Sequence, residues 1–93
     1  MDISDWRKKI DELDRKLAAL LNERAAAAVE IGRLKRNTSL PIYEPERERE
    51  VMVRVAMANE GPLPQDALLA LYRQLMETIK RLEELEKSGS RPA

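Results

Sequence analysis

The sequence predicts an all-α protein with three helices per chain, one long and two shorter, which pairs with a second copy as an intertwined six-helix homodimer. Three observations support this prediction. Apolar residues recur every three or four positions over a long stretch without proline, and two shorter stretches of the same kind follow it. The first helix is also too long for one small domain to cover.

The first helix is predicted from about residue 3 to about residue 36. Ser4 or Asp2 is its expected N-terminal cap, and residues 37–39 followed by Pro41 form a clear stop. Charged residues occupy most of its other faces. The stripe with 3-4 spacing consists of Ile3, Trp6, Ile10, Leu13, Leu17, Leu20, Arg24, Ala27, Ile31 and Leu34.

A second helix is predicted from Pro45, whose fixed φ angle suits a first helical position, to the break at residues 59–62. A third should start near Pro64 and fade at residues 87–89. Residues 1–87 are therefore predicted to form one domain, with a disordered tail at residues 88–93. The apolar face of the third helix consists of Leu68, Leu71, Leu75, Ile79 and Leu82, with Tyr72 and Met76 beside it.

The length of the first helix predicts the dimer. At 1.5 Å per residue it spans about 50 Å, whereas a compact domain of this size has a radius of gyration of about 12 to 13 Å. Two shorter helices cannot cover so long a stripe. A two-fold dimer in which the long helices cross is the simplest closed arrangement.

Composition excludes several classes of function. Lys and Arg number 17, as do Asp and Glu, and the signs alternate along the chain, so nucleic acid and anionic membranes are not expected as partners. The chain contains neither Cys nor His, which removes thiol chemistry, the commonest metal ligand and the commonest general base. No secretory signal or 18-residue apolar run is present, so a cytoplasmic protein is expected.

Charged residues on the apolar faces are the first indication of a binding site. Arg24 stands in the stripe where a hydrophobic residue is expected, and Lys35 lies eleven residues later on the same face, about 16 Å along the axis. Arg7 lies about 25 Å from Arg24 along the helix, so it could reach the same ligand only from a partner chain. Glu48 and Glu83 border the apolar faces of the second and third helices.

Each of these residues alone is more often structural, because a long cation reaches solvent or pairs with an acid and a helix acid is usually solvated. Together they outline a polar pocket inside a helical bundle, where such proteins place their ligand sites. Two cations on one face could hold a small dianion between them.

Six segments carry a family resemblance, namely residues 10–14 (IDELD), 20–24 (LLNER), 30–35 (EIGRLK), 40–48 (LPIYEPERE), 61–63 (GPL) and 71–77 (LYRQLME). With these segments in the right order and at the right spacing, the sequence resembles the all-helical chorismate mutases from about residue 6 to residue 84.

The resemblance implies an enzyme that rearranges chorismate to prephenate without a cofactor, a metal or a covalent intermediate. Arg24 and the partner chain's Arg7 would hold the two carboxylates of chorismate. Lys35 would donate a hydrogen bond to the ether oxygen and assist with a carboxylate. Glu48 would hold the ring hydroxyl, and Glu83 would address the ether oxygen from the other side.

Four positions qualify that assignment. Glu44, where the family usually has Asp, and Arg47 are second-rank candidates for the same site. Many members have Gln where this chain has Glu83. An amide always carries N–H donors, whereas the Glu83 carboxyl can donate to the ether oxygen only when it is protonated. The family commonly has Ser where this chain has Ile79, so no substrate contact is expected there.

Two alternatives remain open from the sequence. An isochorismate-pyruvate lyase uses the same scaffold and also binds a cyclic dianion. A plain helical dimerisation module would account for the charge-rich long helix, but it gives no reason for Arg24 and Lys35 to share one face.

Overall fold

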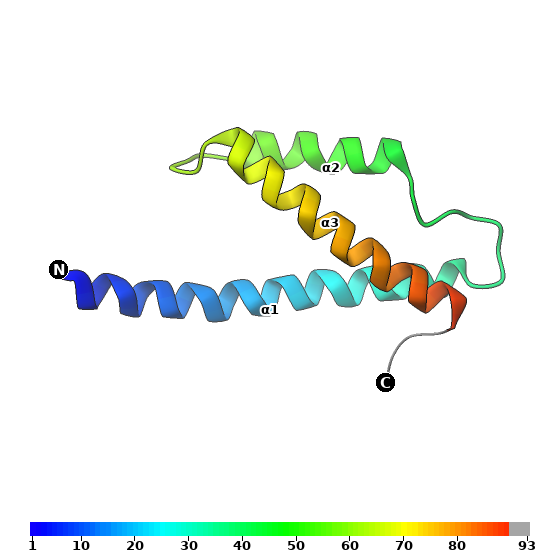
Figure 1. Cartoon of the computed structure of the whole chain (residues 1–93), viewed down its shortest axis with the longest axis horizontal. Helices are drawn as coiled ribbons and strands as arrows, with labels where there is room; N and C mark the ends of the chain where they lie inside the picture. The colour runs from blue at the N-terminus through cyan, green and yellow to red at the C-terminus, as the bar shows by residue number, and fades with distance from the viewer. Residues whose placement is uncertain (90–93) are drawn as a thin grey trace.

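Three helices make up the structure, a computed structural model that describes residues 1–89 (Figure 1). They are α1 (Ile3–Lys35), α2 (Pro45–Ala58) and α3 (Gln65–Ser88), and no strand occurs within those residues. The predicted all-α class is confirmed, and each predicted helix end lies within one or two residues of the observed one.

The start of α1 is closed by a reciprocal cap. The backbone N–H of Asp5 donates to the Asp2 carboxylate at 3.0 Å, and the backbone N–H of Asp2 donates to the Asp5 carboxylate at 3.1 Å. These bonds satisfy two N–H groups, which have no partner within the helix. Of the two expected caps, Asp2 is therefore the one used.

The end of α3 is closed by Gly89, which has a φ of 75° in the left-handed region that glycine adopts without a steric penalty. Its backbone N–H donates to the Glu86 carbonyl. Helix α3 thus continues through Ser88, into the segment predicted as tail, and the rest of that prediction, residues 90–93, lies outside the described residues.

The helices form a flat, elongated molecule measuring 55 × 31 × 14 Å, with a radius of gyration of 16.3 Å (Figure 1). Helix α3 crosses the C-terminal part of α1 and also packs against α2, while within residues 1–89 the helices α1 and α2 do not pack directly on each other. The N-terminal part of α1 extends away from α3. None of the described helices combines the length and apolar character needed to cross a lipid bilayer.

The apolar core of the single chain is small and lies at the crossing of α1 and α3. Ala28 and Val29 of α1 are buried there against Met76 and Ile79 of α3. Leu71, predicted to lie on the packed face of α3, is instead exposed in the single chain. Large apolar side chains along α1 are exposed too, namely Ile3, Trp6, Ile10, Leu13, Leu17, Leu20, Leu21, Ile31 and Leu34.

Candidate functional site

A cleft of about 370 Å³ lies between α1, α2 and α3, beside the connector at residues 36–44. This cleft exists because α1 and α2 each pack against α3 but, within the described residues, do not pack against each other. Its lining residues are Arg24, Ala27, Ala28, Ile31, Lys35, Ile42, Tyr43, Glu44, Arg47, Glu48, Val51, Met76, Ile79, Lys80 and Glu83.

Six of the seven site residues predicted from the sequence line this cleft, namely Arg24, Lys35, Glu44, Arg47, Glu48 and Glu83. Arg7 does not, because it belongs to the same continuous helix as Arg24 and lies about 25 Å further along its axis. The single chain thus brings together every predicted site residue except Arg7, which lies in the first turns of α1.

Lys35 is the most enclosed cation of the cleft, with only 9% of its surface exposed. Its Nζ donates to the carbonyl of Pro41 at 2.7 Å and to Oε1 of Glu44 at 2.9 Å. Glu44 precedes the first residue of α2, and its carboxylate does not cap that helix, so it can accept from Lys35. An ammonium group has three N–H donors, which leaves one for a ligand.

Arg24 lies about one turn before the buried Ala28 of α1 and is half-buried. Its guanidinium carbon is 5.8 Å from the centre of the Tyr72 ring on α3, within the range of a cation–π contact. The planar guanidinium offers a fork of donors that matches a carboxylate. The contact with Tyr72 therefore helps to hold a group of suitable shape for a carboxylate in the lining of the cleft.

Glu83 lies on α3 opposite Lys35 and is half-buried. Burial raises the pKa of Glu83 above its ordinary value, because removal from water disfavours the charged carboxylate. The positive charges of Lys35 and Arg24 oppose that rise in pKa, whereas the negative charges of Glu44 and Glu84 add to it. The net result is a raised pKa, so the protonated form, which can donate a hydrogen bond, persists to a higher pH than it does in an ordinary glutamate.

Lys80 and Tyr43 also line the cleft, and the sequence had not indicated either as a site residue. The Lys80 Nζ lies 4.8 Å from the centre of the Tyr43 ring and forms an ion pair with Glu77 at 3.0 Å. Lys80 follows the buried Ile79, and that proximity to the apolar face was its only sequence signal. Tyr43 lies in the connector, whose path the helical pattern does not predict.

The floor of the cleft is apolar. Ile79 is 5% exposed and contributes to the floor beside Met76 and Ala28. The position where the resemblance suggests a hydroxyl therefore offers only hydrocarbon. Such a surface excludes water and strengthens the electrostatic contacts of the charged groups around it.

The cleft suits a small anion that also carries neutral polar groups. Its lining contains four cations, Arg24, Lys35, Arg47 and Lys80, and three acids, Glu44, Glu48 and Glu83. The lining holds no serine or threonine hydroxyl to serve as a nucleophile. Among residues 1–89, no group of three or more carboxylates is placed to hold a metal ion.

Comparison with known proteins identifies the family. A family model described as chorismate mutase type II matches residues 6–84. The chorismate mutase of Methanocaldococcus jannaschii is 30% identical over 82 residues, which cover 87% of this chain and 83% of that protein. The solved structure of chorismate mutase (form II) from Thermus thermophilus superposes with a TM-score of 0.84 at 35% identity, covering 88% of this chain and 93% of that one.

Other relatives are longer. The bifunctional chorismate mutase/prephenate dehydratase of Aquifex aeolicus is 40% identical over 86 residues, which cover 88% of this chain but 24% of that protein. The chain spans about a quarter of the length of such bifunctional relatives. With the matched segment extending over most of the sequence, the chain belongs to the chorismate mutase type II family.

Proposed function

We propose that this protein is a chorismate mutase, which rearranges chorismate to prephenate on the route to phenylalanine and tyrosine. The observation that carries the proposal is the cleft in which Arg24 and Lys35 of α1 face Glu83 of α3. Membership of the family supports the substrate. The same matches support the proposal that residues 1–87 form one domain, and they lend no support to the lyase or to the dimerisation module.

The proposed reaction breaks one bond and forms another within a single molecule, so it needs no nucleophile, acid–base pair or electron carrier. The protein must hold a flexible dianion in its reactive, chair-like shape and stabilise the negative charge that grows on the ether oxygen. Lys35 would donate to that oxygen from one side and protonated Glu83 from the other. One such preorganised donor is worth about 3 to 4 kcal/mol of the barrier.

Four other residues complete the proposed site. Arg24 would bind one carboxylate of chorismate with its guanidinium fork, and Glu48 would accept a hydrogen bond from the ring hydroxyl. Glu44 would hold Lys35 in place, which the 2.9 Å ion pair supports. Arg47 adjoins the same wall of the cleft.

The second carboxylate would be held by Arg7 of the other subunit in a homodimer. The exposed apolar stripe on the N-terminal part of α1 supports this arrangement, because a contiguous apolar surface of that length marks an interface. Trp6, 56% exposed in the single chain, stands next to Arg7. Packing of this stripe against the other subunit would place Arg7 at the partner's cleft.

The direct test incubates the purified chain with chorismate and follows the loss of chorismate absorbance while prephenate is identified as the product. Release of pyruvate from isochorismate would instead identify the lyase. A bicyclic transition-state analogue should raise the melting temperature, since it binds only the folded state. No turnover and no stabilisation would favour the dimerisation module.

The activity should decline as pH rises through the pKa of Glu83. Burial raises this pKa, so the protonated donor is present below it and is lost above it. Glu83→Gln supplies a donor that does not titrate, and this variant should have a flatter profile of kcat against pH. Identical profiles for the two proteins would contradict the proposed role of Glu83.

A further inference from the structure

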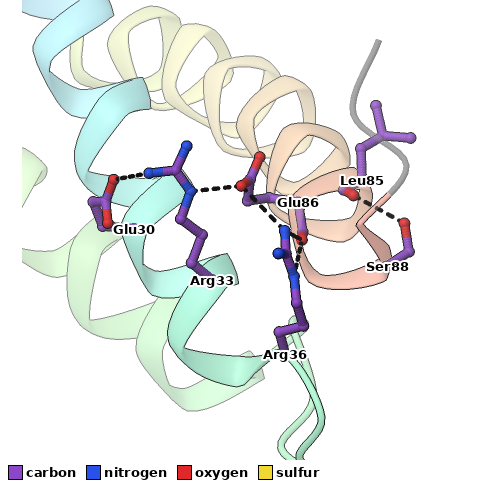
Figure 2. Close-up of polar contacts among 6 residues, drawn as sticks. All are labelled: Glu30, Arg33, Arg36, Leu85, Glu86 and Ser88. Atoms are coloured by element: carbon purple, nitrogen blue, oxygen red, sulfur yellow. Dashed lines mark hydrogen bonds and ion pairs between the residues drawn. The ribbon is translucent and has the colours of Figure 1, made fainter.

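A buried carboxylate outside the cleft joins the ends of α1 and α3. Glu86, on the last turns of α3, is 4% exposed. Its Oε1 accepts from Nε of Arg33 at 2.6 Å and from Nη2 of Arg36 at 3.3 Å (Figure 2). Arg36 also donates to the backbone carbonyl of Glu86, from Nη2 at 2.6 Å and from Nε at 3.1 Å. Glu86 does not line the cleft.

Stability alone is a weak reason for this cluster. Removing a carboxylate from water costs several kcal/mol, and well-packed apolar residues often stabilise a buried site as well as an ion pair does. Arg33 and Arg36 keep 45% and 42% of their side chains exposed, so neither would be trapped without water if Glu86 were absent. The cluster does define the orientation of Glu86, because two planar guanidinium groups bind this one residue from two sides.

Gly32 shows that the helices are held in close contact beside this cluster. A Cβ atom at residue 32 would lie 2.8 Å from the backbone oxygen of Glu83 and 3.2 Å from the Cβ of Glu86. The backbone of Glu83 therefore packs directly against α1 at Gly32, and Gly32 lies less than one helical turn before Lys35. Glu86 follows Glu83 by three residues, so the cluster and the proposed hydrogen-bond donor occupy neighbouring turns of α3.

We propose that Glu86, held by Arg33 and Arg36 above Gly32, is a positioning residue that sets where the Glu83 carboxyl lies relative to Lys35. This inference rests on the proposed function. A slide or rotation of α3 on α1 would shift the Glu83 carboxyl relative to Lys35, and a misplacement of about 1 Å can cost on the order of 100-fold in rate. The contacts of Glu86 with Arg33 and Arg36 oppose that motion.

The test uses two variants of the full chain that break the cluster with opposite changes of charge, Glu86→Leu and Arg36→Met. In both, kcat should fall at least about tenfold while KM changes less than about threefold, since Arg24 is untouched. Glu30→Leu is the matched control. It removes the other partner of Arg33, at 2.7 Å on the exposed side, and leaves the link to α3 intact, so its kcat should stay within about twofold of the wild type.

A carbon-13 NMR titration of the Glu83 carboxyl measures its pKa and distinguishes a displacement of Glu83 from a plain effect of the changed charge. This measurement does not depend on activity. If α3 shifts and Glu83 gains water, its pKa falls in both variants, because burial is the largest cause of the raised pKa and its loss outweighs a weaker attraction to Lys35. A plain charge effect would lower the pKa in Glu86→Leu and raise it in Arg36→Met. Opposite shifts, or unchanged titrations with kcat within about twofold of the wild type, would overturn the proposal.

Arg36→Met carries the test alone if Glu86→Leu does not fold, because the two explanations predict opposite signs for its pKa shift. A wild-type chain without mutase activity would contradict the proposed function. The titration would still decide whether Glu86 positions Glu83.

Discussion

Lys35→Ala is expected to lower kcat at least about 100-fold while the protein stays folded. Lys35 is the most enclosed cation of the cleft, and one of its three N–H donors remains for the ether oxygen after its bonds to Pro41 and Glu44. Alanine removes the donor that would meet the growing negative charge. The measurement is steady-state turnover of chorismate, with circular dichroism and sedimentation to verify fold and assembly.

Lys87→Ala is the matched control for this variant. Lys87 also ties a helix to the connector, through Nζ and the carbonyl of Leu40, but it does not line the cleft. If anchoring of the connector were the main contribution of Lys35, both variants would lose similar activity. Near-normal turnover in Lys35→Ala would remove Lys35 from the mechanism.

Mixed subunits of Arg7→Ala and Arg24→Ala are expected to recover activity that neither variant has alone. Each homodimer lacks one arginine in both sites, whereas a heterodimer has one site with both arginines and one site with neither. Random exchange makes half of the dimers heterodimers, so about a quarter of wild-type activity should return. Turnover is measured before and after subunit exchange, and native mass spectrometry verifies the exchange.

Arg24→Ala mixed with the double variant Arg7→Ala/Arg24→Ala provides the control, because no combination of these chains forms a site with both arginines. Its activity should stay at the background level. Persistent inactivity of the first mixture after verified exchange would contradict shared sites. It would also leave the exposed stripe on α1 without its proposed role.

Local signals predicted the helices and part of the site because both depend on residues close in the chain. Pro45 and Gly89 mark helix ends through backbone preferences that act within one turn. Arg24 and Lys35 share a face because eleven residues are close to three whole turns of a helix. Their shared orientation toward a cleft follows from that spacing once a second helix covers the face.

Contacts between segments that are distant in the sequence could not be predicted from such local signals. Lys80 meets Tyr43 only because the connector at residues 36–44 brings Tyr43 beside α3. Glu86 lies 53 residues from Arg33 and 50 from Arg36, and in the sequence it is one acid among several on a charged helix. Leu71 carries the same apolar signal as Ile79, yet only Ile79 is buried in the single chain.

The sequence by itself determined where the helices begin and end, which of their faces are apolar and which cations share a face. These properties depend on backbone preferences and on the 3.6-residue period of a helix. Only the tertiary structure decided that α3 crosses α1 at Gly32, that a cleft remains between α1 and α2, and that Glu86 is enclosed. Those outcomes depend on the angle and depth at which helices pack, which the side chains of all the partners set together.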